Sequence, residues 1–245
     1  MLLEDSVAGR PLSVSWARFV ELVEATRDEP PYHLRKILEL LEQVRAGRRP
    51  EDVAILDHGY GKGLVVLYLA ALGYDNVHGV NISGNNIGGL NRILSEMLDI
   101  REDRFRVYDG KNLPYADGTI DYIISQQVLE HVSDALIDPY YAEEGRVLKP
   151  QGIAFHQVPH RFVPYEAHTR TWFVHYLPSR LNHFLYRILD CDMSFVETEL
   201  FLRTPRFHRR KIERHIGSYL DLTAYRLIYV QEFQYYDGSI WLRRL

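Results

Sequence analysis

Three glycines at alternate positions follow a short apolar run, and this feature constrains the fold more than any other. The run covers residues 53–56, and the glycines are Gly59, Gly61 and Gly63. Glycine lets the backbone turn sharply and approach a ligand closely, because no β-carbon fills the space. A buried strand that ends in such a loop and continues into an apolar helix at 64–72 is typical of a parallel α/β sheet. In such a sheet, ligands bind at the carboxyl ends of the strands.

The spacing of these glycines excludes two common nucleotide-binding loops. A dinucleotide-binding fingerprint needs glycine at its first, third and sixth positions, but counting from Gly59 the sixth position is Leu64. A P-loop places Ser or Thr directly after its lysine, whereas Lys62 is followed by Gly63. A tight turn between a strand and a helix, with no ligand, is the other interpretation that stays open.

Strand and helix patterns alternate as far as residue 158. Strand-like segments after the first occur at 77–82, 105–108, 120–124 and 153–158. Helical periodicity separates them, at 64–72, at 87–98, near Val128 and at 140–147. This alternation predicts a doubly wound, mostly parallel sheet. Two helices precede the sheet between residues 13 and 45, and they are separated at Pro30-Pro31 because proline cannot continue a helix interior.

The alternation stops after residue 158. The segment 159–219 is rich in aromatic, histidine and arginine side chains, and its apolar spacing predicts a largely helical cap. Strand-like segments return at 224–230 and 239–242, with Asp237-Gly238 placed for a hairpin turn. We therefore predict a Rossmann-like fold with a seven-stranded sheet and a cap inserted before the last two strands. The expected division is N-terminal helices at 1–50, the sheet domain at 51–158 and 220–245, and the cap at 159–219.

Composition limits the compartment and the partners. The formal net charge of −4 argues against a protein that neutralises a nucleic-acid backbone, so no nucleic-acid partner is expected. The single cysteine, Cys191, cannot form an internal disulfide, and residues 1–9 lack the basic start and apolar run of a secretory signal. No apolar run approaches the ~20 residues that span a bilayer. These features predict a cytoplasmic protein without a transmembrane segment, and they leave the oligomeric state open, a homodimer included.

Five short motifs, in a fixed order between residues 53 and 155, carry a resemblance to a known family. They are VAILDHGYGKG at 53–63, GVNIS at 79–83, DG at 109–110, DYII at 121–124 with VLEHV at 128–132, and RVLKPQG at 146–152. Together they resemble the class I methyltransferases that depend on S-adenosylmethionine (SAM). The resemblance implies SAM as the cofactor, the Rossmann-like fold of that class, and methyl transfer as the activity.

The resemblance also implies roles for the glycine loop. Asp57 would hold the loop or the ammonium group of SAM. Backbone groups of Gly59, Tyr60 and Gly61 would approach the amino-acid part of SAM, with Gly63 completing the loop. A side chain at these glycines would occupy space that the ligand needs.

The ends of the next strands complete the cofactor site that the resemblance implies. Asp109 would accept a hydrogen bond from the adenine amino group and the Gly110 amide would face a ring nitrogen, although Asp109 could instead cap its own loop. Gln126 would line the methyl region. Most members of the family have Asp or Glu where this chain has Asn81, followed here by Ile82. An amide can still bond both ribose hydroxyls, but without charge assistance.

Methyl transfer from a sulfonium mainly requires alignment of the acceptor and exclusion of water. A hydroxyl acceptor also needs a general base or a metal ion. Seven of the eleven histidines lie between His156 and His215, in the segment expected to cover the acceptor. We therefore expect His160, and after it His131, as the catalytic base, with a structural histidine as the alternative. We expect no metal site, because Pro159 prevents His156 and His160 from forming a helical pair.

The acceptor is the least constrained part of the prediction. Residues 159–178 loosely resemble the cap of bacterial methyltransferases encoded with surface-polysaccharide genes, and Trp172, Phe173 and Tyr176 would suit stacking on a sugar ring or a hydrophobic core. The basic residues between 203 and 214 could bind an anionic acceptor or form a solvated helix face. We expect O-methylation of a saccharide or related small metabolite, in polysaccharide biosynthesis. The alternatives are a lipid, quinone or amine acceptor, and a catalytically silent SAM-binding subunit.

Overall fold

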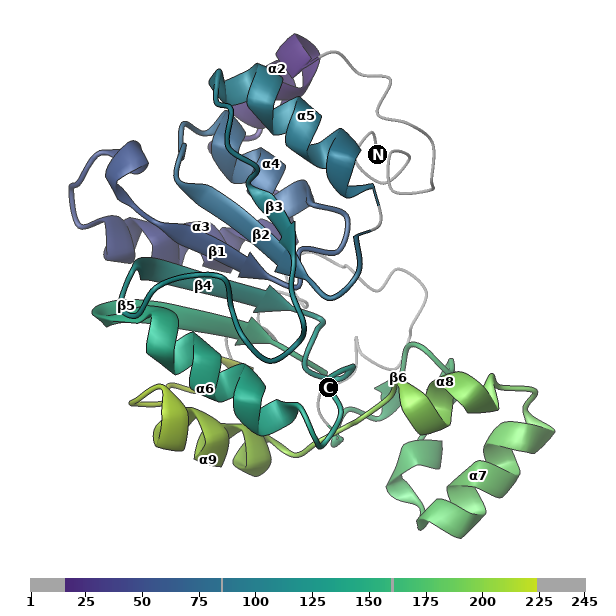
Figure 1. The fold of residues 1–245 in the computed structure, drawn as a ribbon. Coiled ribbons are helices and arrows are strands. Elements are labelled where there is room, and N and C mark those ends of the chain that lie inside the picture. Colours follow the sequence, from purple (N-terminus) through teal and green to yellow (C-terminus); the bar gives the residue numbers. More distant parts are fainter. Residues whose placement is uncertain (1–15, 85, 160, 224–245) are drawn as a thin grey trace.

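The computed structural model describes residues 16–84, 86–159 and 161–223, and Figure 1 shows how they are arranged. These residues form a five-stranded parallel sheet with helices packed against it, which is the Rossmann-like α/β fold that the sequence predicts. The candidate base His160 and the strands predicted at 224–230 and 239–242 lie outside the described residues. In the part of the chain that the structure describes, no helix is long and apolar enough to cross a membrane.

The sheet has the strand order β3-β2-β1-β4-β5, and every neighbouring pair is parallel. The chain runs outward from β1 through β2 to β3 and then crosses back to add β4 and β5 on the other side. The carboxyl ends of β1 and β4 are therefore the switch point, where ligands of such sheets bind. The strands are Ile55–His58 (β1), Val77–Asn81 (β2), Phe105–Val107 (β3), Ile120–Gln126 (β4) and Leu148–Gln157 (β5).

Helices cover the sheet because successive strand residues point to opposite faces. Ile55 packs into the core on the face with α2, α3, α4 and α5, whereas Leu56 packs into a separate core on the other face, near α6. Pro30 and Pro31 separate the first two helices, and α3 contacts β4 and β5. The helices are Trp16–Ala25 (α2), Tyr32–Arg45 (α3), Leu64–Ala71 (α4), Ile87–Leu98 (α5) and Ile137–Val147 (α6), with a short 3-10 helix η1 at Pro50–Asp52.

The segment after β4 differs from the sequence prediction. We expected a helix near Val128, but residues 127–136 form turns and bends. The carbonyl oxygen of Glu130 accepts a hydrogen bond from the amide of Phe201, at 2.7 Å. The carbonyl of Leu129 accepts one from the Arg203 guanidinium, at 3.0 Å. These distant donors occupy carbonyls that a helix would have paired with amides four residues later.

The cap follows β5 and projects from one end of the sheet (Figure 1). Its described part begins with a small antiparallel hairpin and continues into two helices. The amide of Arg161 donates to the carbonyl of Arg203 at 2.9 Å, so the first and last parts of the cap lie side by side. The elements are Tyr165–Glu166 (β6), Thr171–Trp172 (β7), Val174–Tyr176 (η2), Ser179–Ile188 (α7) and Met193–Thr198 (α8).

Helix α9, Pro205–His215, returns to the sheet domain and packs against α6. Lys211 Nζ lies 2.6 Å from Asp138 Oδ1, and His215 Nε2 lies 3.1 Å from the same oxygen. The helix belongs to residues 159–219, which we assigned to the cap, yet its contacts are with the sheet domain. The division into domains at residues 159 and 219 stays a prediction.

Candidate functional site

The glycine loop has the backbone conformation that its sequence requires. Gly59, Gly61 and Gly63 have φ angles of 98°, 51° and 77°, in the left-handed region that favours glycine. A β-carbon at Gly59 would collide with the methyl groups of Val128. At Gly61 the nearest atom to an added β-carbon is the carbonyl oxygen of Gly59, at 4.0 Å, so the space beside Gly61 is open.

Two of the expected backbone donors are already paired. The amides of Gly59 and Tyr60 both donate to the carbonyl of Val80 at the end of β2, at 2.7 and 3.3 Å. These bonds hold the start of the loop against the sheet. The open approach at Gly61 is therefore the part of the loop best placed to meet a ligand.

Asp57 lies in β1 directly before the loop, between Gly79 of β2 and Ile124 of β4. Its side chain is buried, and burial raises the pKa of the Asp57 carboxyl to about 7. A carboxyl in this range ionises readily when a cation approaches, because the cation stabilises the charged form. Asp57 can thus respond to a positively charged ligand near the loop.

Asn81 and Ile82 end the second strand in different ways. Asn81 Oδ1 accepts a hydrogen bond from the amide of Ile82 at 2.8 Å, so this oxygen is already used within the chain. The Ile82 side chain is 67% exposed. An added β-carbon at Gly110 would lie 3.5 Å from Ile82 and 3.6 Å from Leu136, so these two apolar side chains flank Gly110.

Asp109 caps its own loop. Its Oδ1 accepts the amides of Asn112 at 2.7 Å and Lys111 at 2.8 Å, and its Oδ2 accepts the Asn112 side-chain amide at 2.8 Å. These hydrogen bonds, those from Asn112 above all, lower the pKa of Asp109 to about 2. The capping role that was the alternative is present, and the adenine contact stays a prediction.

Gln126, at the carboxyl end of β4, bonds to the N-terminal helices. Its Nε2 donates to the carbonyl of His33 in α3, at 3.1 Å. This bond brings α3 beside the switch point of the sheet. The predicted contact of Gln126 with the methyl region is not tested by this geometry.

Glu130 is the most unusual side chain near the switch point. It is fully buried, and neither carboxylate oxygen has a hydrogen-bond partner among the described residues. Burial raises the pKa of Glu130 to about 7. Val128, two residues earlier, covers Gly59, so the segment that carries Glu130 begins beside the glycine loop.

Two histidines meet beside Glu130, one from each part of the molecule. His131 Nδ1 bonds to the carbonyl of Glu199 at 2.7 Å, and its ring centroid lies 5.1 Å from that of His168 in the cap. His168 Nδ1 bonds to Glu166 Oε1 at 2.7 Å, and this bond raises the pKa of His168. Sequence reasoning selected His131 but neither Glu130 nor His168 as reactive groups. The adjacent Glu130-His131 pair was visible in the sequence, whereas no local pattern indicates His168.

Arg203 is a structural residue, in contrast to the role in anion binding that we considered. The side chain is buried, and its guanidinium donates to the carbonyls of Leu129 and Val132, at 3.0 and 2.7 Å. It also pairs with Asp134 Oδ1 at 2.7 Å. Arg203 therefore fixes the turns around Glu130 and His131. Of the other basic residues in this run, Lys211 pairs with Asp138 and Arg209 with Glu213.

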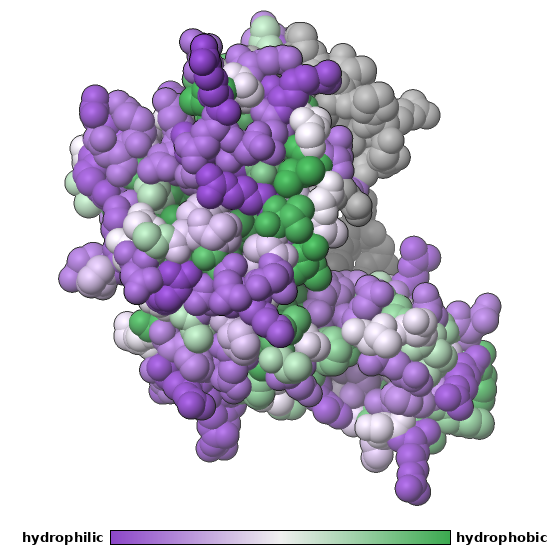
Figure 2. All heavy atoms as spheres, viewed as in Figure 1, coloured by the Kyte–Doolittle hydropathy of each residue, from purple (hydrophilic) through white to green (hydrophobic). Residues whose placement is uncertain are grey.

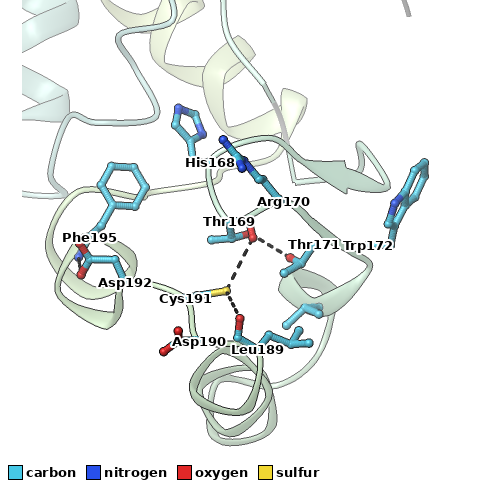
Figure 3. A pocket seen from close by; sticks show the side chains of 11 residues that line it. His168, Thr169, Arg170, Thr171, Trp172, Leu189, Asp190, Cys191, Asp192 and Phe195 are labelled. Atoms are coloured by element: carbon cyan, nitrogen blue, oxygen red, sulfur yellow. Dashed lines mark hydrogen bonds between the residues drawn. The ribbon is translucent and has the colours of Figure 1, made fainter. Parts of the chain in front are cut away.

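The cap has a hollow of about 770 Å³, shown in Figure 3. Trp172, one of its lining residues, is 45% exposed, so the aromatic side chains predicted for ring stacking are not all core residues. His168 contributes to the lining of the hollow as well as to the contact with His131. The lining residues all belong to the cap: His168, Thr169, Arg170, Thr171, Trp172, Val174, Leu189, Asp190, Cys191, Asp192 and Phe195.

Comparison with known proteins shows which family residues 56–156 match. Residues 56–156 match the family described as a methyltransferase domain. The ubiquinone biosynthesis O-methyltransferase of Mesorhizobium japonicum is 36% identical over 111 residues, which are 45% of this chain and 43% of that protein. Methyltransferase GfsG of Streptomyces halstedii is 35% identical over 99 residues, 40% of this chain and 34% of that protein. The match thus spans less than half the length of each curated relative.

Solved structures share the fold over most of the chain. A geranyl diphosphate methyltransferase in complex with SAM has a TM-score of 0.51 and 17% identity, covering 96% of this chain and 85% of that one. The geranyl diphosphate C-methyltransferase of Streptomyces coelicolor has a TM-score of 0.50 and 16% identity, covering 98% and 79%. The glycine loop and the family match together make residues 56–156 a methyltransferase domain of the class I SAM-dependent type. SAM is the cofactor of this class.

Proposed function

We propose that this chain is a SAM-dependent O-methyltransferase whose acceptor is a hydroxyl of a saccharide or related small metabolite. The observation that carries the proposal is the position of the unpaired Glu130 carboxylate. It follows the strand that ends at the switch point, two residues after Val128, which covers Gly59 of the loop, and it meets His168 of the cap. A cofactor bound at the loop and an acceptor bound under the cap would meet in this place.

Different residues are proposed to bind the cofactor and to deprotonate the acceptor. The open backbone at Gly61 would receive the amino-acid part of SAM, with Asp57 as its countercharge. The acceptor oxygen would attack the methyl carbon in line with the carbon–sulfur bond. His160 and His131 are the proposed bases that take the hydroxyl proton, because an imidazole exchanges protons near neutral pH.

The lining of the cap hollow supports a saccharide. Trp172 is an exposed aromatic residue of the lining, which also includes the hydroxyl side chain of Thr171 and the charged side chains of Arg170 and Asp190 (Figure 3). Aromatic stacking combined with polar contacts suits a ring that carries hydroxyl groups. A place in polysaccharide biosynthesis would agree with such an acceptor.

A phenolic or quinol lipid is the second candidate. The relative from Mesorhizobium japonicum is named for O-methylation in ubiquinone biosynthesis. The cap also exposes large apolar side chains, including Phe173, Phe184 and Ile188, and Figure 2 shows hydrophobic residues along its edge. An acceptor with an apolar tail would cover part of this surface.

The cofactor site is tested by substitution at Gly61. Gly61→Val would fill the open space beside the loop, and we expect SAM binding measured by calorimetry to be lost. Gly73→Val is the matched control, because Gly73 is also left-handed with φ of 91° and open space around it, but lies outside the loop. Equal SAM affinity in Gly61→Val and wild type would refute the loop assignment.

The acceptor is tested with methyl-labelled SAM and three acceptor sets: saccharides and nucleotide sugars, catechol-type quinols with apolar tails, and amines. We expect label in a methyl ether of the first set. Label only in the second set would select the lipid candidate, and label in amines would refute O-methylation. His160→Ala and His131→Ala should each slow turnover while sparing SAM affinity, and an unchanged rate would remove that histidine as the base.

A further inference from the structure

Three side chains able to ligate a metal ion meet where the cap contacts the segment after β4. One carboxylate oxygen of Glu130 and one ring nitrogen each of His131 and His168 lie within 4.8 Å of one another. Glu130 and His131 follow the switch-point strand, whereas His168 lies between the two strands of the cap hairpin. The set therefore forms only when the cap is in place.

The Glu130 carboxylate lacks the partners that its burial requires. The side chain has no exposed surface, and both of its oxygens are without a hydrogen-bond partner in the described part of the chain. An ionised carboxylate in such a place is costly unless a cation or several donors neutralise it. The two histidines beside it provide nitrogen lone pairs, so this group of side chains suits a cation.

The Nδ1 atoms of both histidines have partners of the kind seen in metal sites. Metal-binding histidines usually donate their second ring N–H to a carbonyl or a carboxylate, which fixes the tautomer and the ring orientation. Here His131 Nδ1 is 2.7 Å from the carbonyl oxygen of Glu199, and His168 Nδ1 is 2.7 Å from Glu166 Oε1. Glu166 is in turn held by the backbone amide of His168 at 3.0 Å. With each Nδ1 acting as donor, each Nε2 keeps its lone pair for a ligand bond.

We propose that Glu130, His131 and His168 bind one divalent transition-metal ion of the zinc class. Two imidazoles and one carboxylate suit Zn²⁺ or Co²⁺, whereas Mg²⁺ and Ca²⁺ prefer sites made of oxygen atoms. Ligand atoms around a tetrahedral ion lie about 3.4 Å apart, so small side-chain movements would complete the coordination. The site departs from the sequence expectation of no metal, which considered only His156 and His160.

Three protein ligands leave a coordination position open, as in catalytic rather than structural zinc sites. Resting on the proposed function, we assign that position to the acceptor hydroxyl. The bound hydroxyl would give its proton to His160, its oxygen would form a bond to the methyl carbon, and the carbon–sulfur bond of SAM would break, leaving S-adenosylhomocysteine. In this arrangement His131 holds the ion, so His160 alone of the two proposed bases takes the proton. Metal binding itself does not depend on this assignment.

The binding experiment uses the full chain after treatment with a chelator, titrated with Zn²⁺ in a calorimeter. We expect one ion per chain, and a loss of affinity of about 100-fold or more in Glu130→Gln and in His168→Asn, since even changes behind the ligands cost about 10 to 100-fold. His183→Asn is the matched control, because His183 is another partly exposed histidine of the cap. Equal affinity in wild type, Glu130→Gln and His168→Asn would overturn the site.

A second measurement does not depend on variants that might fold differently. Wild-type protein loaded with Co²⁺ should show the intense visible absorption of tetrahedral coordination, and added Zn²⁺ should remove it. Octahedral-type weak absorption, or binding of Mg²⁺ in preference to Zn²⁺, would overturn the assignment of ion class.

Methyl-transfer assays separate the site from its role. Loss of transfer on chelation, restored by Zn²⁺ or Co²⁺, supports the activated hydroxyl. Transfer to a hydroxyl that is unchanged by chelation would overturn that role while leaving the binding result standing. Stoichiometric metal binding without transfer to any hydroxyl would reject the proposed function and keep the metal site.

Discussion

Two buried glutamates, Glu144 on α6 and Glu130 after β4, differ in their hydrogen-bond partners. Both are fully buried. Glu144 Oε1 lies 2.9 Å from His58 Nδ1, and its Oε2 lies 2.6 Å from His156 Nε2. Burial would raise the pKa of Glu144, but the charge and hydrogen bonds of the two histidines outweigh it and lower the pKa to about 2. Glu130 has no such partners in the part of the chain that the structure describes, and burial raises its pKa to about 7.

The Glu144 cluster is closed within the protein. His58 Nε2 lies 2.7 Å from the hydroxyl of Tyr108, and the His58 ring stacks on Tyr140 with centroids 3.9 Å apart. Each polar end of this cluster finds a partner from the chain itself, which is how buried charges are normally retained. The comparison teaches that a buried carboxylate without hydrogen-bond partners, next to the switch point, indicates a ligand site. A buried carboxylate whose oxygens are both paired within the chain indicates a structural role.

The largest expected difference is in stability. Glu144→Ala leaves the buried His58 and the partly buried His156 without their acceptor, and we expect a loss of about 3–5 kcal/mol in the free energy of unfolding. Glu130→Gln replaces a buried carboxyl that keeps its proton below about pH 7 with an amide of similar shape, and at about pH 5 it should change the stability of the metal-free protein by less than about 1 kcal/mol. Urea unfolding measures both. Similar losses of stability in the two variants would contradict the claim that Glu144 is structural and Glu130 is not.

Arg203 donates hydrogen bonds to the turns that carry Glu130 and His131, and its hydrogen bonds in the described part of the chain do not reach the cluster around Glu144. Its removal should therefore destabilise these turns. Arg203→Met leaves the carbonyls of Leu129 and Val132 without their donor, and we expect a loss of about 2–3 kcal/mol. The control is Arg206→Met, at an exposed position of α9, which should cost less than about 0.5 kcal/mol. If Arg203→Met lowers the free energy of unfolding no more than the control does, the turns at 127–136 do not depend on Arg203.

The two glutamates should give stability a pH dependence of opposite sign. The lowered pKa of Glu144 adds stability that is present above about pH 4.5 and is lost as pH falls toward 2. The raised pKa of Glu130 means that the folded, metal-free protein keeps a proton that the unfolded chain has released, so stability falls as pH rises from about 4.5 to 7. Each slope is at most about 1.4 kcal/mol per pH unit for a single group.

Urea unfolding across pH 3–8 checks this pattern. Glu144→Gln should flatten the acidic side of the profile, and Glu130→Gln should flatten the side between pH 4.5 and 7. A profile that changes in the same window for both variants would contradict the assigned pKa directions.

We expect the smallest change in stability at Tyr108, at the edge of the cluster around Glu144. Tyr108→Phe removes the hydroxyl that partners His58 Nε2, and we expect a loss of about 1 kcal/mol in unfolding free energy. Zinc affinity should not change, because Tyr108 belongs to the complete cluster. A fall in zinc affinity comparable to that of Glu130→Gln would show that the clusters are coupled.

The sequence predicts the parts of the fold that depend on local pattern. The apolar run before Gly59 and the spacing of the glycines indicate a strand, a loop and a helix, and the structure has β1, the open loop at Gly61 and α4 in that order. The strand predicted at 120–124 is present as β4 and extends to Gln126. These elements are predictable because burial and backbone conformation act within a few residues.

Long-range contacts explain what the sequence did not indicate. The helix expected near Val128 is wrong because Arg203 and Phe201 bind the carbonyls of that segment from across the chain. The approach of His168 to Glu130 likewise depends on how the cap folds back. His156, which we considered only as a partner of His160, belongs instead to the closed cluster around Glu144.

The hydrogen bond between Arg161 and Arg203 closes the base of the cap, since the chain leaves and rejoins the sheet domain at neighbouring points. Residues 162–202 therefore begin and end at neighbouring points, and an exchange of this stretch would have to preserve that junction and the hydrogen bonds that join Phe201 to Glu130 and Glu199 to His131. A lineage built on this plan can acquire a new acceptor by replacing one continuous stretch of gene, while the machinery that holds the methyl donor is inherited unchanged. The ligand set proposed here adds one condition to such exchanges, because the incoming stretch would have to bring its own histidine.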